Sequence, residues 1–311
     1  MDPTTTESPR LLKGALFRGI GYEPHPGQLL VHRSKAKMRV LACGVRWGKT
    51  TVAVGEAAAE LLQPRPDSMG WVVAPTYEQA DRIFSKTVAA LQRHFAHRIV
   101  DIDQRGKRIA VTNLGGGGSV LCSKSADRPD SLLGEGLDWL VLDEATRVDR
   151  SIWDEHLSQR LIDRGGSSLL LSTPRGCDWF YEKYRRGQKG RDPDCESWRS
   201  PSSDNPHLNP AIIEAEKARV PAEVYAQEYG ACFLGEEKMP CLTCGYDPTA
   251  MERSLGWDFE GEPPYPRCPE CGHDVHRDGV TRETGPSSNL WYRPGPPNPS
   301  VLPGIAEPSG P

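Results

Sequence analysis

Short apolar runs alternate with longer stretches in which apolar residues recur at helical spacing. Almost purely apolar runs of this length are typical of strands buried on both faces, and they occupy residues 39–43, 71–74, 140–142 and 168–171. The stretches with helical spacing are residues 51–62, 77–95, 151–162 and 178–186. This strand–helix alternation predicts an α/β fold with a mainly parallel sheet and helices on both faces.

Weaker patterns predict the remaining elements. Residues 1–20 read as a mobile lead-in, and residues 29–37 as a helix before the first strand. Two alternating stretches flank a glycine-rich turn and predict a hairpin, 108–112 with 119–122. The last predicted elements are a helix over 212–229 and a strand over 231–234.

The loop from Gly44 to Thr50 joins the first strand to a helix and carries a phosphate-binding pattern. A glycine-rich turn at a helix N-terminus directs several backbone N–H groups at one point, where the helix dipole also favours an anion. We expect Lys49 to reach the β- and γ-phosphates and the Thr50 hydroxyl to ligate Mg²⁺. The strict motif has Gly where this chain has Cys43, so a chance Gly-Lys-Thr at a helix start is the alternative.

Polar residues follow two later strands. Asp143 and Glu144 end the strand over 140–142, and the carboxyl ends of strands in open α/β sheets bind ligands. We expect Asp143 to hold Mg²⁺ and Glu144 to polarise the attacking water. Thr173, after the next strand, is a candidate sensor of the γ-phosphate. Taken singly, these motifs also fit an acidic surface turn and an ordinary Ser-Thr-Pro turn.

Composition adds two constraints. The 311 residues are 37% hydrophobic and 26% charged, as in a water-soluble protein, and no apolar run approaches the ~20 residues of a membrane span. We therefore expect a cytoplasmic protein. Residues 240–311 carry ten acidic and five basic residues, a net of −5, whereas the rest is close to neutral. This balance excludes a protein that coats DNA through excess positive charge.

Taken in order, these motifs resemble the ATPase domain of the large terminase subunit of tailed bacteriophages. Arg46 and Trp47 match the family's nucleotide loop, and 22–24 followed by Gln28 is similar to its adenine-contacting segment. Further matching segments cover 71–76, 128–134, 172–174 and 227–233, so the resemblance spans about residues 20–235.

The resemblance implies a P-loop NTPase fold of the RecA-like (ASCE) type that binds ATP with Mg²⁺. The implied nucleotide-binding residues are Gln28, Gly44, Trp47, Gly48, Lys49, Thr50 and Asp143. The implied catalytic residues are Glu144, Arg46 and Thr173. Leu133 and Val45 stand where relatives often have arginine, so the charge that compensates the transition state has to come from Arg46, Arg128 or a neighbouring subunit.

The implied function is that of an ATP-hydrolysing motor subunit that translocates double-stranded DNA into a procapsid in the host-cell cytoplasm. The implied partners are double-stranded DNA, the portal protein, the small terminase subunit and further copies in a ring. Only 77 residues follow Leu234, too few for the RNase H-like nuclease domain of relatives. We therefore expect nuclease activity to be absent from this chain, with a separate nuclease subunit as a further candidate partner.

A zinc-ribbon pattern follows the ATPase region. The four cysteines stand in two Cys-x₂-Cys pairs, which predicts a closed structural Zn²⁺ site formed by Cys241, Cys244, Cys268 and Cys271. The expected organisation is a flexible N-terminus, an ATPase domain, a zinc-ribbon module and a Pro/Gly-rich disordered tail, over residues 1–20, 21–235, 236–283 and 284–311.

Two other functions remain open from the sequence. Residues 143–146 are close to the box of a helicase-type ATPase, although that class needs a second RecA-like lobe. In the other alternative, the ATPase core has lost turnover and presents the zinc ribbon to partners as a recruitment protein.

Overall fold

The computed structural model describes residues 12–188 and 191–235, with the backbone of 274–275 and 281–282. The chain divides into two compact units, residues 1–234 and 235–311. In the second unit, β9 (Asp274–Val275) pairs antiparallel with β10 (Thr281–Arg282). The four cysteines of the expected zinc ribbon lie outside the described residues, and so does the expected disordered tail.

The first unit is built on one eight-stranded sheet, in the order β3-β4-β5-β2-β6-β7-β1-β8. The six strands from β5 to β8 in this order run parallel, whereas β3 and β4 pair antiparallel at one edge. The predicted parallel sheet is therefore confirmed. The strands are β1 (Met38–Cys43), β2 (Asp67–Ala74), β3 (Ile99–Asp103), β4 (Arg108–Thr112), β5 (Gly118–Ser125), β6 (Trp139–Leu142), β7 (Ser167–Ser172) and β8 (Cys195–Ser200).

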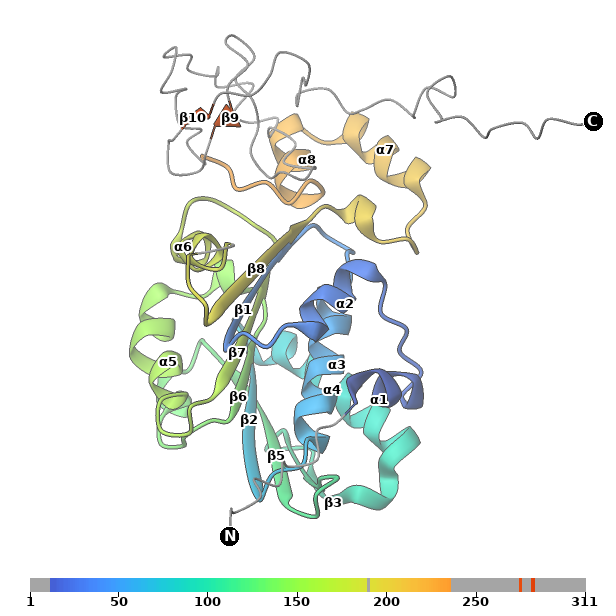
Figure 1. The fold of residues 1–311 in the computed structure, drawn as a ribbon, viewed down its shortest axis with the longest axis vertical. Helices are drawn as coiled ribbons and strands as arrows, with labels where there is room; N and C mark the ends of the chain where they lie inside the picture. The colour runs from blue at the N-terminus through green and yellow to red at the C-terminus, as the bar shows by residue number, and fades with distance from the viewer. Residues whose placement is uncertain (1–11, 189–190, 236–273, 276–280, 283–311) are drawn as a thin grey trace, which may run out of the picture. The chain divides into compact units, whose positions relative to one another are not determined.

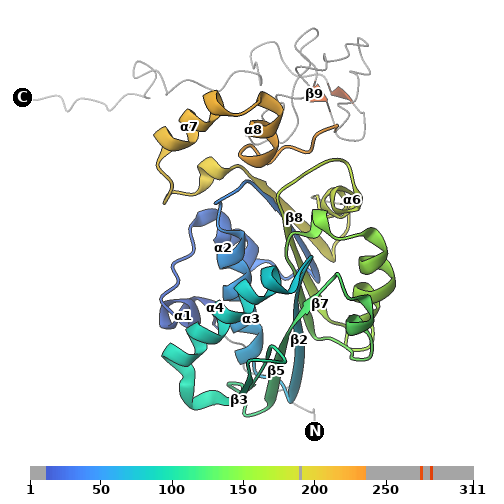
Figure 2. The same cartoon turned by 180° about the vertical axis from the view of Figure 1, so that it is seen from behind.

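Helices cover both faces of this sheet (Figures 1 and 2). One face carries α1 (Lys13–Gly19), α2 (Pro26–Arg33), α3 (Lys49–Leu62) and α4 (Tyr77–Phe95), which continues into η1 (Ala96–Arg98). The other face carries η2 (Pro129–Leu132), η3 (Ala145–Arg147), the π-helical turns η4 (Ile152–Leu157), α5 (Ser158–Arg160) and α6 (Trp179–Arg186). After β8 come η5 (Ser202–Asp204), α7 (Pro210–Arg219) and α8 (Ala222–Glu228).

The apolar runs become central strands because both of their faces are buried. Along β1, Leu41 and Cys43 pack with α3 and α4, whereas Val40 and Ala42 point into the opposite core. Successive strand residues point to opposite faces, so the side chains on both faces of a central strand are buried and most of them are apolar. This pattern is what made these strands recognisable in the sequence.

The first two helices differ from the sequence-based expectations. The predicted mobile lead-in over 1–20 is wrong for α1, whose Leu16 is buried in the core. The helix expected over 29–37 begins earlier, because Pro26 occupies its first turn and Gln28 caps the N-terminus.

The helix predicted over 212–229 is two helices, α7 and α8. The break falls at Val220, which is extended (φ −113°, ψ 155°) immediately before Pro221. Proline clashes with a helical conformation of the residue before it. The backbone therefore breaks at Val220, although the apolar pattern continues on both sides of the break.

The strand predicted over 231–234 is also wrong. Ala231 has a positive φ of 54°, and the segment forms one isolated bridge, Gly176 with Leu234.

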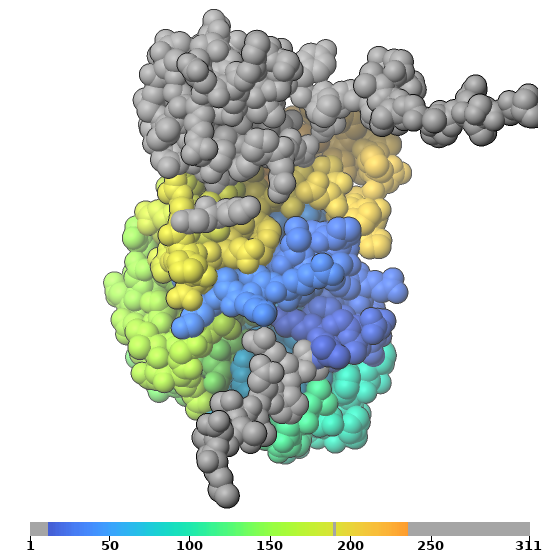
Figure 3. Space-filling view, viewed as in Figure 1, coloured from blue at the N-terminus to red at the C-terminus, as the bar shows by residue number. Residues whose placement is uncertain are grey.

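The outermost parallel strand is β8 instead, and it contains few apolar residues. In Figure 3 the yellow segment that includes β8 lies beside the blue N-terminal segment on one face of the first unit. An edge strand of this kind carries no apolar run, and neither does β3 at the other edge.

A buried carboxylate ties the N-terminal helices to α3. Glu56 is 1% exposed, and its oxygens lie 2.9 Å from Lys13 Nζ, 2.6 Å from Arg39 and 2.6 Å from His32 Nδ1. Burial by itself raises the pKa of Glu56, but the charges of Arg39 and Lys13 outweigh it and hold that pKa well below its usual range. The carboxylate is therefore ionised and fully partnered.

His32 extends this network to the segment before α2. Burial lowers the pKa of His32, so the ring is neutral and donates from Nδ1 to Glu56. The Nε2 atom then accepts a hydrogen bond from Tyr22 Oη at 2.8 Å. Residues that precede the phosphate loop are thus fixed to the helix that follows it.

Replacing Glu56 with Gln should strongly destabilise the protein. The substitution leaves Arg39 and Lys13 buried or half-buried without their counter-charge, which costs about 3–5 kcal/mol of unfolding free energy. Chemical denaturation measures the change. The matched control Glu78→Gln breaks an exposed pair with Arg82 and should stay close to wild type. Equal effects of the two substitutions would contradict the assigned role of Glu56.

Candidate functional site

The backbone of the loop after β1 is left-handed at two positions and closely packed at a third. Arg46 and Gly48 lie in the left-handed region, with φ 62° and 110°. A Cβ on Gly44 would lie 2.5 Å from Ser202 Oγ and 2.6 Å from the Tyr229 carbonyl oxygen. Glycine is therefore required at position 44 for close packing and favoured at 48 by conformation.

Lys49 lies at the first residue of α3 with its ammonium group inside the protein. Its Nζ donates to the carbonyl oxygens of Cys43 at 2.8 Å and Gly44 at 3.0 Å, and to Thr173 Oγ1 at 3.0 Å. Burial lowers the pKa of Lys49, and the carboxylates of Glu144 and Asp143 oppose that effect. A cation held beside the N-terminus of a helix is poised to contact phosphate oxygens.

Asp143 and Glu144 follow β6 at the same edge of the sheet. Asp143 is 8% exposed, and burial, followed by the charge of Glu144, raises its pKa to about 6. Glu144 adopts a left-handed backbone (φ 50°) and is half-buried, with Oε2 3.6 Å from Arg147 Nε. The two neighbouring carboxylates are therefore in different environments, one enclosed and one open to solvent.

The ends of β6 and β7 are joined by hydroxyl groups. Thr146 Oγ1 lies 2.7 Å from Ser172 Oγ and donates to the Thr173 carbonyl oxygen at 3.2 Å. Since Thr173 also accepts from Lys49, a continuous set of contacts runs from the loop after β1 to the turn after Glu144. Sequence reasoning found Thr173 but missed the role of Thr146, because its contacts join positions 26 and 27 residues apart.

Two residues predicted to bind nucleotide, Trp47 and Gln28, are buried in this structure. Trp47 is 1% exposed and packs edge-on against His25, with ring centroids 4.7 Å apart, so its ring is enclosed in the core. Gln28 is buried; its Nε2 donates to the Gly48 carbonyl oxygen at 3.3 Å, and its Oε1 accepts from the His25 backbone N–H at 3.1 Å. Both residues contact His25 behind the loop, and their contact with nucleotide stays a prediction.

The segments after β8 hold the loop from its other side. Val45 N–H donates to the Glu228 carbonyl oxygen at 2.7 Å, and Ser202 Oγ donates to the Val45 carbonyl oxygen at 2.6 Å. Asn205 Nδ2 donates to the Arg46 carbonyl oxygen at 2.8 Å. Sequence reasoning missed Ser202 and Asn205, because no motif marks hydrogen bonds between positions 157 and 159 residues apart.

The edge offers oxygen ligands suited to Mg²⁺. Asp143 supplies an enclosed carboxylate. Its pKa is raised because the nearby positive charge does not offset the effect of burial. The half-buried Thr50 is adjacent to Lys49 at the start of α3, and a hard cation prefers such oxygen donors. Arg46 is exposed and forms no ion pair with the residues that the structure describes.

In residues 12–188 and 191–235, no three His, Cys, Asp or Glu side chains gather as a metal site. Among the helices of that same part of the chain, none has the length and apolar character needed to cross a bilayer.

Removing the charge of Asp143 should change how stability depends on pH. Because its folded pKa is about 6, the folded state binds more protons than the unfolded state between about pH 4 and 6. Stability therefore falls as pH rises through that window and stays level above it. In EDTA without nucleotide, Asp143→Asn should unfold with about 2–3 kcal/mol more free energy than wild type at pH 7, and with no difference at pH 4. Parallel pH curves, or the same shift in the exposed control Asp163→Asn, would contradict this.

Comparisons with known proteins agree with this geometry. Residues 40–239 match the family model described as "Terminase large subunit, T4likevirus-type, N-terminal". The terminase large subunits of Thermus phage G20c and Thermus virus P23-45 are each 38% identical over 245 residues, covering 70% of this chain and 50% of theirs. The chain thus spans about half the length of the curated relatives it matches.

Solved structures give the same result. The large terminase ATPase domain of Thermus phage P74-26 is 36% identical, with a TM-score of 0.64 over 70% of this chain and 96% of that domain. The large terminase of another thermophilic bacteriophage, in complex with ATP-gamma-S, shares the fold at 14% identity, with a TM-score of 0.54 over 67% of this chain and 52% of that chain. The chain therefore belongs to the terminase large subunit family and matches the N-terminal ATPase domain of that family.

Proposed function

We propose that this chain hydrolyses ATP as a motor subunit of a phage DNA-packaging terminase. The observation that carries the proposal is the contact of Lys49 Nζ with Thr173 Oγ1 beside Asp143. Three motifs from three strands thereby share one site. The large terminase solved with ATP-gamma-S shares this fold, which supports nucleotide binding by the present chain.

Each residue of the site has a separate role in the proposed reaction. Lys49 exchanges its carbonyl and hydroxyl acceptors for β- and γ-phosphate oxygens when nucleotide enters. Thr50 and Asp143 would hold Mg²⁺, which supplies positive charge to the phosphates. Glu144, half-buried and open to solvent, orients and polarises the attacking water. Once Lys49 no longer contacts Thr173, Thr173 transmits this loss of contact to the turn after β6.

The transition state also needs a guanidinium. Leu133 is 53% exposed, so its position is accessible but carries no charge. Arg128 lies over the Tyr77 ring, 5.9 Å from its centroid, and Arg46 extends from the loop itself. We assign this role to Arg46, because it is closest in sequence to Lys49 and has no ion pair within the described residues.

The assembly is part of the same proposal. The substrate is double-stranded DNA moved into a procapsid, and the partners are the portal protein, the small terminase subunit and further copies of this chain in a ring. Cys241, Cys244, Cys268 and Cys271 would hold a structural Zn²⁺. These assignments rest on family membership and on the cysteine spacing.

Glu144→Gln should abolish turnover and leave nucleotide binding intact. Removing a general base costs about 10²–10⁴-fold in rate, whereas the phosphate contacts come from other residues. Steady-state ATP hydrolysis should be measured with and without double-stranded DNA, and ATP binding by calorimetry. We expect DNA to stimulate wild type and the exposed control Glu155→Gln equally.

Three outcomes separate the candidate functions. Turnover that survives Glu144→Gln would sink the active-site assignment. ATP binding without turnover in wild type, with DNA and ring partners present, would favour the recruitment protein. Stimulation by single-stranded DNA alone would favour the helicase-type ATPase.

A further inference from the structure

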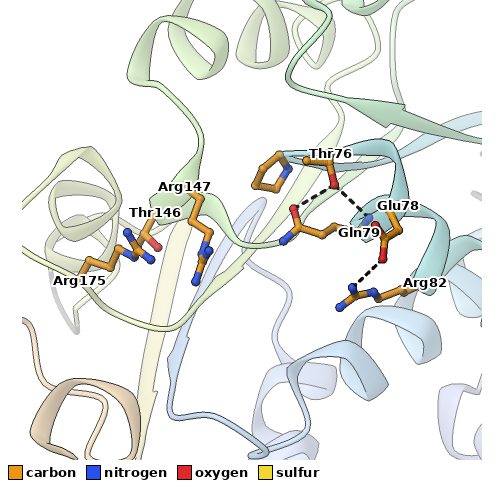
Figure 4. A pocket seen from close by; sticks show the side chains of 8 residues that line it. Thr76, Glu78, Gln79, Arg82, Thr146, Arg147 and Arg175 are labelled. Carbon is orange, nitrogen blue, oxygen red and sulfur yellow. Dashed lines mark hydrogen bonds and ion pairs between the residues drawn. The ribbon is translucent and has the colours of Figure 1, made fainter. Parts of the chain in front are cut away.

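A cationic pocket lies beside the nucleotide edge and contains no residue of the phosphate loop. Its volume is about 630 Å³, and Figure 4 shows the side chains that line it. Three of them are arginines from three separate elements: Arg82 on α4, Arg147 on η3 and Arg175 in the loop after β7. We call this the arginine pocket.

The positive charge of the arginine pocket is only partly compensated. Arg82 pairs with Glu78 at 3.2 Å, and both side chains are well exposed, so the pair offsets little of the charge. Arg147 lies 3.6 Å from the Glu144 carboxylate. Arg175 forms no ion pair with any residue that the structure describes. The lining therefore has more cationic than anionic groups.

The other donors of the pocket are neutral. Thr76 Oγ1 contacts Gln79 Oε1 at 3.4 Å, which leaves the amide NH₂ group of Gln79 for a ligand. The Gln79 side chain extends from α4 toward Arg147 in Figure 4. Guanidinium forks with amide and hydroxyl donors match the oxygens of a phosphate group better than they match any cation or apolar ligand.

The pocket has a defined connection to the nucleotide site. Thr146 lines it and contacts Ser172 Oγ and the Thr173 carbonyl oxygen, while Thr173 Oγ1 accepts from Lys49. The charge of Arg82 also acts on Asp143. An anion in the arginine pocket would thus be connected to Lys49 through Thr146 and Thr173.

We propose that the arginine pocket is a second phosphate site, which binds a phosphate oxyanion outside the phosphate loop. Two sources share this chemistry: inorganic phosphate leaving the nucleotide site, and a backbone phosphate of DNA. The proposal goes beyond ATP hydrolysis, because it requires the three arginines and no turnover. Its failure is therefore distinguishable from failure of the proposed function.

The test measures two probes on the full chain with the phosphate loop filled by Mg²⁺ and ADP. Inorganic phosphate binding is followed by calorimetry, and binding of a short DNA duplex by fluorescence anisotropy. In Arg82→Gln/Arg175→Gln we expect the affinity for at least one probe to fall by about tenfold or more. A loss for phosphate identifies the free anion as the ligand, and a loss for the duplex alone identifies the DNA backbone.

A matched double variant controls for net charge. Arg93→Gln/Arg150→Gln removes the same two charges from exposed positions outside the pocket, one of them on α4. It should bind both probes as wild type does. The proposal is overturned if wild type binds neither probe, if the pocket variant binds both normally, or if the control variant loses as much affinity.

Discussion

A buried ammonium group organises the nucleotide edge of this domain. Lys49 enters the core at the start of α3, and two carbonyls at the end of β1 and the hydroxyl of Thr173 satisfy its donors. A buried charge without partners costs several kcal/mol, so the loop after β1 and the loop after β7 have to meet at this point. These two segments are 124 residues apart in the sequence, and the parallel order of β6, β7 and β1 places them together.

Around Lys49 the loop backbone is fixed from two sides. On the α2 side Gln28 donates to the Gly48 carbonyl oxygen and the Trp47 ring packs on His25, and Ser202 and Asn205 hold the loop from the segment after β8. The Glu56 network in turn fixes α1 and α2 to α3. The loop can therefore offer its peptide groups to a phosphate at low entropic cost, because its conformation is already set.

The sequence could predict whatever has a local signal. The central strands, the bounds of α4, the phosphate loop and the acidic pair after β6 all follow from apolar runs, helical spacing and motifs. The missed features have none: β8 is a polar edge strand, and Thr146, Ser202 and Asn205 act through contacts that only the fold creates. The burial of Trp47 also has no local signal, because the sequence of a loop tryptophan is the same whether its ring faces a ligand or the core.

The most direct test is a crystal structure of the chain with Mg²⁺ and ATP-gamma-S. We expect Lys49 Nζ to leave Cys43, Gly44 and Thr173 for the β- and γ-phosphate oxygens, with Thr50 and Asp143 toward the Mg²⁺ ion. Glu144 should face the γ-phosphate, with Trp47 still enclosed. A nucleotide bound elsewhere, or one bound at the loop while Lys49 keeps its present three contacts, would contradict the role assigned to this buried ammonium.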